Sequence, residues 1–406
     1  MKNKKLLGLS ILALVAIFVA STFLFGNFKN DGKSDDSHSQ SSFSGNSSES
    51  TIVYVAAGGG KEDYLADKDI LKILNDDYHI SPVYDTWSNG KTITKPLIRE
   101  YVNLGDKDIA KRLADGENIG INTEGVSRYD ALFTSDQRFY DYYRMPVKEN
   151  EPDRYTTLAG GMMLNTPIVM YSWKSVVTPL MNEGIVSEKD GVYYVSDMEK
   201  MMNMILEGKK WQDIGLDLYG YLNIRSTDPV TSSPGATYYG LLLSILSGGE
   251  INDATIDTNL ETLKEFYDKS GYMNNTPADL FERYLKTGVG GEPIIVDYEK
   301  SLIEFINSNP NGFNQVKDEI VLLYPEPTIW NSHCFMAFSE NGKKLYDALQ
   351  DERIQQIAWE KYGFRTGTAN AEYDVSNLGI KVPKNINQTV PSLKMEYYNK
   401  LIDFLK

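Results

Sequence analysis

Cysteine and histidine are scarce in this 406-residue chain, which contains one Cys and three His. The single Cys334 excludes an intramolecular disulfide, and we interpret it as a small buried apolar residue. The histidines, His38, His79 and His333, are far apart, so no Cys/His cluster with metal-ligand spacing is present. The sequence therefore predicts neither a metal site nor a cofactor.

Motifs of several enzyme classes are also missing. The sequence contains no Gly-x-Ser-x-Gly and no His-Glu-x-x-His. Residues 58–61, Gly-Gly-Gly-Lys, resemble part of a phosphate-binding loop, but the upstream Gly is missing and Glu62 stands where Ser or Thr would hold magnesium. The same segment fails the dinucleotide pattern, because Lys-Glu-Asp follows the glycines. We predict a protein that is not an enzyme. A transferase or hydrolase with an acid/base pair among the acidic residues stays open as an alternative.

Basic residues are in the minority. The chain has 41 Lys and Arg against 56 Asp and Glu, a net charge of −15. Nucleic-acid-binding proteins show basic faces, and anionic membrane surfaces attract basic segments, so neither is a predicted partner of the folded part. A small anionic ligand stays compatible with this balance, because the charge around one site can oppose that of the whole chain.

The one long apolar run is at the N-terminus. Three lysines precede residues 6–26, which contain no charged residue. A helix of this length, at about 1.5 Å a residue, can cross a hydrocarbon core of about 30 Å, and the positive flank predicts that the rest of the chain is outside. A signal peptide cleaved at residues 19–21, Val-Ala-Ser, is the alternative. No Cys follows the run, which excludes a lipid-modified N-terminal Cys. Both alternatives predict an exported protein.

Residues 27–50 are rich in serine. They hold nine Ser among Asn, Asp, Gly and Gln and almost no apolar residue. Such a segment cannot bury enough surface to offset its ordering entropy, so we predict a disordered, flexible tether. An export signal without disulfides suits a bacterial surface. We expect a protein of the cell membrane whose bulk is extracellular, or a secreted protein if the N-terminal segment is cleaved.

From residue 51 onward, short β-branched runs alternate with amphipathic stretches. A helix through Leu65, Ile70 and Leu74 is expected after the first run. The strand candidates are residues 52–56, 79–84, 131–133, 167–171, 222–224 and 293–297. This alternation predicts an α/β fold whose parallel sheets are covered on both faces by helices. Most junctions are polar turns that cap the next helix, and ligands of such folds bind where these turns converge.

The turn richest in hydroxyl groups lies between residues 224 and 236. It reads Ile-Arg-Ser-Thr-Asp-Pro, then Thr-Ser-Ser-Pro-Gly-Ala after Val230, and an apolar helix follows. This composition fixes a tight turn and directs hydroxyls and free N–H groups to one point, where an anion can bind. The alternative is a well-capped buried helix with a rigid turn, and the composition favours neither.

Several short motifs occur together in the order found in one family. They are Thr166–Lys174 (TPIVMYSWK), Trp211–Gly215 (WQDIG), Ser226–Gly235, Gly288–Glu299, Leu323–Pro325 (LYP) and Gln355–Phe364. With them the chain resembles type II periplasmic solute-binding proteins, especially the molybdate- and sulfate-binding components of ABC importers. The resemblance implies two α/β lobes, each a mixed sheet flanked by helices, joined by two crossovers. Lobe one would comprise residues 51–165 plus 327–406, and lobe two residues 166–326.

The resemblance also implies where a ligand would be bound. The implied contacts are Gly58, Gly59, Gly60 and Lys61; Thr134 and Ser135; Ser226, Thr227, Asp228, Ser232, Ser233 and Gly235; and Tyr298. Glycines stand where the molybdate and sulfate relatives have a Ser, and residues 89–130 form a longer stretch than in those relatives. We interpret Trp330, Ser332 and His333 as core residues, with a place at the hinge as the alternative.

These expectations combine into one functional hypothesis. A monomeric extracytoplasmic protein captures a small solute, an anion or oxyanion, between its lobes and presents it to an ABC permease. The alternative keeps the fold without transport and makes the chain a membrane-anchored ligand sensor or scaffold.

Overall fold

The computed structural model describes residues 50–86, 129–144, 157–366, 374–376 and 378–406. The predicted membrane span or signal at 1–26 lies outside the described residues. So do the predicted tether, apart from Ser50, and most of the stretch at 89–130. Within the described part, no helix is both long enough and apolar enough to span a membrane.

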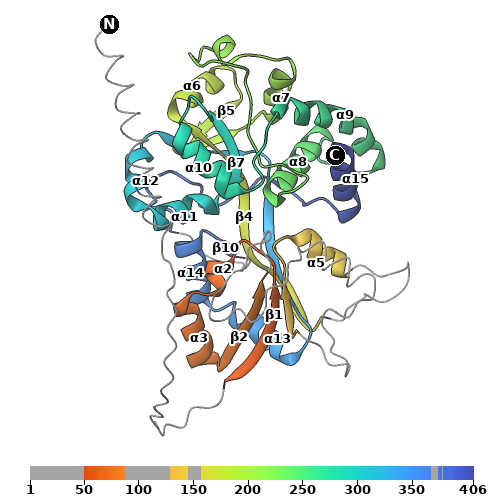
Figure 1. Ribbon diagram of the computed structural model, residues 1–406, viewed down its shortest axis with the longest axis vertical. Helices are drawn as coiled ribbons and strands as arrows, with labels where there is room; N and C mark the ends of the chain where they lie inside the picture. The colour runs from red at the N-terminus through yellow and green to blue at the C-terminus, as the bar shows by residue number, and fades with distance from the viewer. Residues whose placement is uncertain (1–49, 87–128, 145–156, 367–373, 377) are drawn as a thin grey trace, which may run out of the picture.

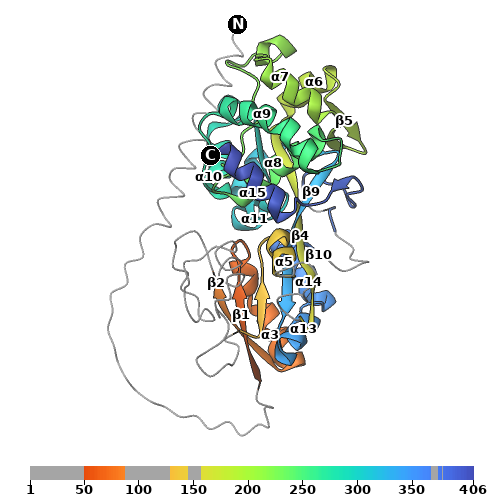
Figure 2. The same ribbon diagram turned by 90° about the vertical axis from the view of Figure 1, so that its right-hand side faces the viewer.

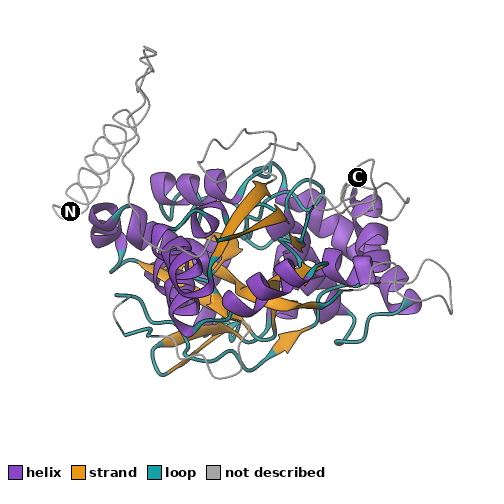
Figure 3. Cartoon of the chain, turned by 90° about the horizontal axis from the view of Figure 1, so that it is seen from below, coloured by secondary structure: helices purple, strands orange, loops and turns teal. Residues whose placement is uncertain are grey.

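Two bodies of strands and helices, here called lobe one and lobe two, are joined by a pair of long strands (Figures 1 and 2). These strands are β4 (Ala159–Trp173) and β9 (Thr328–Ala337), which pair antiparallel from Ala159 opposite Ala337 to Pro167 opposite Trp330. Helices surround the strands (Figure 3). The predicted α/β class is confirmed.

Lobe one contains a mixed sheet. Its strand β1 (Thr51–Ala57) pairs in parallel with β2 (Ile80–Thr86) and with β3 (Ala131–Phe133), and β3 pairs antiparallel with β9. The short β10 (Arg365–Thr366) pairs with β4. The helices of this lobe are α2 (Glu62–Leu65), α3 (Lys68–Tyr78), α5 (Gln137–Arg144), α13 (Glu340–Ala348) and α14 (Glu352–Tyr362).

The helix expected after the first strand is interrupted, which corrects the prediction. α2 ends at Leu65, and the carboxylate of Asp67 accepts hydrogen bonds from the backbone N–H groups of Asp69 and Ile70. Asp67 therefore acts as the N-cap of α3. The apolar spacing of Leu65, Ile70 and Leu74 is compatible with one helix, but the capping carboxylate starts a new one.

Lobe two is organised around the far half of β4. β7 (Ile294–Tyr298) and β8 (Ile320–Pro325) pair antiparallel with β4, β6 (Val192–Val195) pairs in parallel with β8, and β5 (Val186–Lys189) pairs antiparallel with β6. Its helices are α6 (Lys174–Asn182), α7 (Met198–Leu206), the short 3-10 helix η1 (Trp211–Ile214), α8 (Ser233–Leu246), α9 (Asp253–Ser270), α10 (Pro277–Thr287), α11 (Lys300–Ser308) and α12 (Pro310–Val316).

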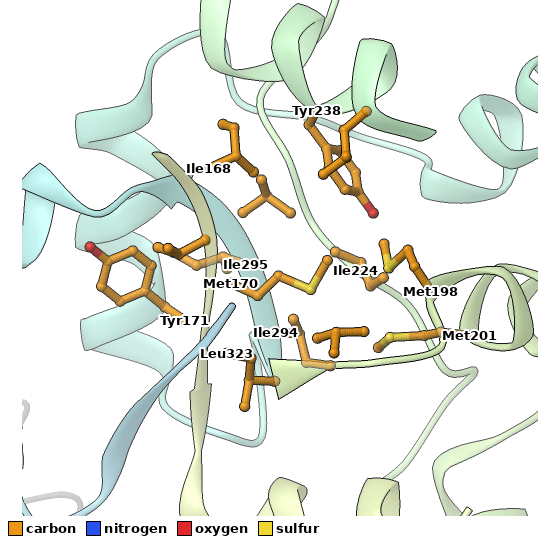
Figure 4. Close-up of a cluster of buried hydrophobic side chains, with 14 of the residues drawn as sticks. Ile168, Met170, Tyr171, Met198, Met201, Ile224, Tyr238, Ile294, Ile295 and Leu323 are labelled. Atoms are coloured by element: carbon orange, nitrogen blue, oxygen red, sulfur yellow. The ribbon is translucent and has the colours of Figure 1, made fainter. Parts of the chain in front are cut away.

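Each lobe has its own hydrophobic core. The core of lobe one includes Val53, Leu74, Phe133 and Phe335. Figure 4 shows part of the core of lobe two, where Met170 of β4 lies among side chains from β7, β8, α7 and α8. β4 is buried from Met163 to Trp173, and residues 167–171 within it form a continuous apolar run because side chains pack against both faces of the strand.

Two predicted features of lobe two differ from the structure. The strand expected at 167–171 is the second half of the much longer β4, because the chain crosses between the lobes without a turn. Residues 222–224 form no strand. Isolated bridges flank this segment: Tyr221 pairs with Lys210, and Arg225 pairs with Ile295. Neither bridge continues into residues 222–224. The sheet is mixed in both lobes, which confirms what the family resemblance implied and corrects the parallel sheets that the alternation of strands and helices predicted.

The C-terminal segment belongs with lobe two, which corrects the predicted assignment of all of 327–406 to lobe one. Leu393, Leu401 and Leu405 are part of the lobe-two core. The last helix, α15 (Met395–Leu405), packs against α8 and α9, and the short β11 (Thr389–Val390) pairs with the start of β9. An amphipathic helix shows from its sequence that one face is buried, but not against which body it packs.

Candidate functional site

The glycine turn after β1 is closed by a buried lysine. The ammonium group of Lys61 donates to the carbonyl oxygens of Gly58 (2.8 Å) and Thr134 (3.2 Å) and lies 4.7 Å from the centre of the Phe133 ring. Lys61 is only 2 % exposed. The N–H of Gly58 donates to the Phe133 carbonyl at 2.8 Å. Lys61 thus joins the first and second predicted contact turns into one unit and places a positive charge between them.

Strand β9 adds two polar side chains beside these turns. Nδ2 of Asn331 donates to the Ser135 carbonyl (3.2 Å) and lies 3.3 Å from Nε2 of His333. Because Nδ2 can only donate, Nε2 is the acceptor, and the proton of the neutral imidazole is on Nδ1. Neither Nδ1 of His333 nor Oδ1 of Asn331 has a hydrogen-bond partner among the described residues. The strand therefore carries one buried N–H donor and one buried acceptor that are not used.

The electrostatic potential around His333 is positive. Burial lowers the pKa of His333 well below its ordinary value, and the charges of Lys61 and Lys300 lower that pKa further. Gly60, with φ +80°, lies next to the imidazole. A Cβ at Gly60 would be 3.9 Å from Cε1 of His333. Local positive charge thus exists in a chain whose net charge is −15.

A buried ion pair follows the second predicted turn. Asp136 and Arg138, at the start of α5, are 3 % and 5 % exposed. Oδ1 of Asp136 accepts from the backbone N–H (2.8 Å) and from Nε (2.9 Å) of Arg138, and Oδ2 accepts from Nη2. Burial lowers the pKa of the Arg138 guanidinium, but the charge and hydrogen bonds of Asp136 outweigh burial and raise that pKa. The Arg138 guanidinium therefore stays ionised.

In lobe two the hydroxyl-rich turn is tightly packed against its own helix. A Cβ on Gly235 would lie 2.1 Å from the backbone oxygen of Thr227, so the absence of a side chain lets α8 approach the turn. Asp228 accepts from the N–H of Val230 at 2.9 Å, and its own N–H donates to the Asn274 carbonyl at 3.0 Å. These contacts account for Gly235 and Asp228 as structural residues of the turn.

The other hydroxyls of this turn are used unequally. Oγ of Ser226 donates to the Thr227 carbonyl at 3.0 Å, and Oγ1 of the fully buried Thr227 has no hydrogen-bond partner among the described residues. Ser232 is the buried N-cap of α8 and makes no capping hydrogen bond with its side chain. The turn thus retains one unsatisfied hydroxyl.

The two lobes meet at the start of α8. Oγ of Ser233 in lobe two donates to Oδ2 of Asp136 in lobe one at 3.3 Å. The hydroxyl of Tyr298, which is 7 % exposed, faces Ser233 and Thr237 but has no hydrogen bond of ordinary geometry among the described residues. Burial raises the pKa of Tyr298 above its ordinary value, so this hydroxyl stays protonated and can donate. We call the side chains around this contact the junction cluster: Lys61, Thr134, Asp136, Arg138, Ser233, Tyr298, Asn331 and His333.

The junction cluster gathers some of the predicted contact residues. Gly58, Gly59, Gly60 and Lys61 lie beside Thr134 and Ser135 in lobe one, while Ser233 and Tyr298 lie together in lobe two. Ser226 and Asp228 are instead tied to neighbouring residues of lobe two, Met273 and Asn274. The structure thus brings residues from all four predicted sets of contacts to one region. Some members of these sets, such as Ser226 and Asp228, are bonded to other parts of lobe two instead.

Sequence reasoning missed the roles of Asp136, Arg138 and Asn331. Asp136 directly follows the predicted contacts Thr134 and Ser135, and Asn331 lies in the polar stretch Asn-Ser-His of an otherwise apolar strand. A run of polar residues inside a buried strand was the available signal. His333 was interpreted as a core residue; it is buried, but it also belongs to the junction cluster.

A second, buried ion pair links the lobes behind the junction cluster. Arg365 of β10 donates from Nε to Oε2 of Glu299 (2.6 Å) and from Nη2 to Oε1 (2.8 Å), and the hydroxyl of Tyr324 donates to Oε1 at 2.6 Å. Arg365 also donates to the carbonyls of Pro383 and Lys384. We call Glu299 and Arg365 the hinge pair, because they join the end of β7 to the crossing strands.

Metal ligands do not cluster in the part of the chain that the structure describes. No group of three or more His, Cys, Asp or Glu side chains there could hold a metal ion. The chemistry available to the junction cluster is therefore hydrogen bonding and charge: donors from Ser233, Tyr298 and His333, an acceptor from Asn331, and cations at Lys61 and Arg138.

Comparison with known proteins gives similarity only at the level of structure. No family profile matches the chain. No curated protein matches it either. Apo ferric ion-binding protein A of Pasteurella haemolytica is similar at a TM-score of 0.52 and 11% identity, over 87% of this chain and 96% of that one.

Two further solved structures are similar in the same way. A protein of Bordetella parapertussis, described as an extracellular solute-binding protein, has a TM-score of 0.53 and 11% identity over 87% and 97% of the two chains. An ABC transporter substrate-binding protein of Bradyrhizobium japonicum has a TM-score of 0.50 and 10% identity over 87% and 99%. The resemblance found in the sequence is confirmed at the level of fold, and the chain has the two-lobed fold of the type II periplasmic solute-binding proteins.

Proposed function

We propose that this chain is an extracytoplasmic solute-binding protein that captures a small anionic solute between its lobes for an ABC-type permease. The fold supports capture by two lobes that close around a solute. The N-terminal apolar run and the serine-rich segment support export, with the protein either tethered to the membrane or secreted. The junction cluster, together with Thr227, is the proposed binding site.

One observation carries the anionic class of the solute. A carboxylate, that of Asp136, is already stabilised at the junction by the Arg138 guanidinium and by Ser233 at the N-terminus of α8. Helix N-termini favour negative charge, and the cations Lys61 and Lys300 lie close enough to lower the pKa of His333. A negatively charged group is therefore favourable at this place despite the acidic net charge of the chain.

The unsatisfied groups support a solute that makes several hydrogen bonds. The Tyr298 hydroxyl and Nδ1–H of His333 are buried donors without a partner among the described residues. Leaving such donors unpaired costs roughly 1–3 kcal/mol each, and a bound oxyanion would remove that cost. Neutral donors also avoid the burial of an unpaired charge when no solute is bound.

Thermal unfolding of the full chain in detergent tests the class of solute. Sulfate, molybdate, phosphate and citrate are compared with glucose, leucine and ferric ion. A solute present at a hundred times its Kd stabilises the folded chain by about 2.7 kcal/mol. We expect at least one of the anions to raise the melting temperature. A shift with glucose or leucine alone would show that the anionic class is wrong.

Replacement of Tyr298 by Phe tests the site. The substitution removes one donor to the solute but no hydrogen bond of ordinary geometry among the described residues, so we expect an unchanged melting temperature without solute. The affinity for the anion should fall about tenfold or more, because hydrogen bonds to charged groups contribute roughly 1.5–3 kcal/mol. Tyr272→Phe, at a residue that is 72 % exposed, is the matched control and should bind as the wild type does. Equal affinities in titration calorimetry would remove Tyr298 from the site.

A further inference from the structure

Helix α5 of lobe one reaches lobe two through the side chains of one turn. Asp136 accepts the hydrogen bond from Ser233 on α8, and the guanidinium carbon of Arg138 lies 4.1 Å from the centre of the Tyr398 ring on α15. Figures 1 and 2 both show α5 at the edge of lobe one that faces α8 and α15. Lobe one therefore contacts lobe two through an ion pair whose two members, Asp136 and Arg138, both belong to lobe one.

The position of the Asp136 carboxylate has the properties of an anion site. It lies at the N-terminus of a 14-residue helix, where Pro234 lacks an N–H and the other first-turn N–H groups have no partner within the helix. The Tyr298 hydroxyl, more than nine-tenths buried and without a partner among the described residues, faces the same helix end at Ser233 and Thr237. This unused donor is a second, independent sign that the helix end is built to receive an acceptor.

We propose that Asp136 is an intramolecular competitor of the solute: its carboxylate occupies the anion position of lobe two and holds the lobes together when no solute is bound. This inference rests on the proposed function, because it assigns the competitor for the same site. An anionic solute takes the place of the Asp136 carboxylate at Ser233 and also accepts a hydrogen bond from Tyr298. Asp136 then keeps its hydrogen bonds to Arg138, which come from its own lobe.

The arrangement determines which solutes bind and how tightly. Asp136 is present at a high effective concentration because it is part of the same chain. A solute must therefore contact α8 better than a carboxylate that is already in place, and its apparent affinity falls by the fraction of molecules in which the position is free. An anion that contacts α8 no better than a carboxylate does cannot displace Asp136. An anion that also accepts hydrogen bonds from Tyr298 and His333 can displace it.

The distance between the lobes tests the first half of the proposal without any solute. Spin labels on Ser187→Cys in β5 and Gln350→Cys in lobe one, both exposed positions, report this distance in the full chain in detergent. We expect Asp136→Asn to lengthen or broaden the distance distribution, because Arg138 then lacks a countercharge and is hydrated only when the lobes separate. Asp141→Asn, on the exposed side of the same helix, is the control and should match the parent.

A milder variant covers the case in which Asp136→Asn does not fold. Ser233→Ala leaves the Asp136–Arg138 pair and the contact of Arg138 with Tyr398 intact and removes the hydrogen bond from Ser233 to Asp136. It should shift the distances in the same direction by a smaller amount. If neither variant that folds changes the distances, Asp136 does not hold the lobes together and the proposal is overturned.

Anion affinity tests the second half. Titration of the full chain with sulfate, phosphate and citrate should give a Kd about tenfold lower for Asp136→Asn than for the Asp141→Asn control, because the competitor has lost its charge. An unchanged or higher Kd overturns the competition. If the distances change as expected but none of the three anions binds either protein, the proposed anionic function fails while the contact between the lobes stands.

Discussion

Two buried ion pairs lie between the lobes, and they differ in where their partners come from. The hinge pair joins Arg365 to Glu299, and Tyr324 adds a further donor to the same carboxylate. In the pair at the junction, Asp136 and Arg138 both come from the start of α5, and they contact lobe two through the hydrogen bond from Ser233 at 3.3 Å and through the packing of Arg138 on the Tyr398 ring. Separation of the lobes at the junction breaks a hydrogen bond and a cation–ring contact, whereas separation at the hinge pair breaks an ion pair.

This difference indicates which contact is permanent. A buried charge that loses its partner is strongly destabilising, so the hinge pair fixes the crossing strands relative to β7. The junction pair keeps its charges matched in either state, because both are part of the same helix. The lobes can therefore separate in front of the crossing strands while the hinge pair stays intact, which is the movement that a solute-binding clamp needs.

Removal of the arginine of the hinge pair should have the largest effect. Arg365→Met leaves the Glu299 carboxylate, which is fully buried, without its cation, and we expect the free energy of unfolding to fall by about 3–5 kcal/mol. Chemical denaturation measures this loss. Arg353→Met, which removes an exposed arginine paired with Asp351, is the control and should change stability little. The added substitution Glu299→Gln should restore part of the stability, and a loss no larger than that of the control would contradict a fixed hinge.

A third buried carboxylate, that of Asp297, extends the comparison of Glu299 with Asp136, because no arginine among the described residues pairs with it. Asp297 is 1 % exposed, and burial raises its pKa to about 6 from an ordinary value of 3.8. The folded state therefore binds this proton more tightly than the unfolded state does. The resulting stabilisation is complete below pH 4 and is lost as the pH rises through about 6, by at most about 3 kcal/mol.

Denaturation of the wild type and of Asp297→Asn between pH 4 and pH 7 measures that loss. The stability of the wild type relative to the variant should decrease as the pH rises. His333 has the opposite sign, because its lowered pKa contributes stability above pH 6.5 that is lost on acidification, but it is present in both proteins and cancels in the difference. Parallel stability curves would mean that Asp297 titrates normally.

The junction pair should show the smallest of the three effects. Arg138→Met also removes a buried cation, but the lobes can separate and hydrate Asp136. We therefore expect a loss of about 1.5–3 kcal/mol, the scale of hydrogen bonds to a charged group. Chemical denaturation of Arg138→Met and of Arg365→Met under the same conditions compares the two losses in the free energy of unfolding. A loss equal to that of the hinge variant would show that the two pairs are equally permanent.

Local sequence patterns predicted the helices and strands better than they predicted which other elements these pack against. The strand candidates at 52–56 and 131–133 identified β1 and β3, since strand propensity acts over a few residues. The same reasoning assigned α15 to the wrong lobe and did not reveal that β4 continues from one lobe into the other. Burial against a particular body depends on contacts between residues that are far apart in sequence.

The candidate site shows the same division. The hydroxyl-rich turn at 224–236 was predicted from its composition, whereas the contacts at 58–61, 134–135 and Tyr298 were implied by the family resemblance. The role of Gly235 could not be predicted, because only the packed structure shows the Thr227 carbonyl where a Cβ would be. The Asp136–Ser233 contact joins residues 97 positions apart, and no local pattern indicates it.

The sequence by itself determined the α/β class, the acidic balance of the chain and the polar turns that end its strands, because composition and short-range spacing encode each of these. Tertiary structure alone decided which turns meet, that the crossing strand β9 contributes to the junction, and that a carboxylate of lobe one lies against a helix end of lobe two. The physical reason is that charge, burial and hydrogen bonding at a junction depend on which residues are close in space. The fold determines those neighbours, and they can be far apart in the sequence.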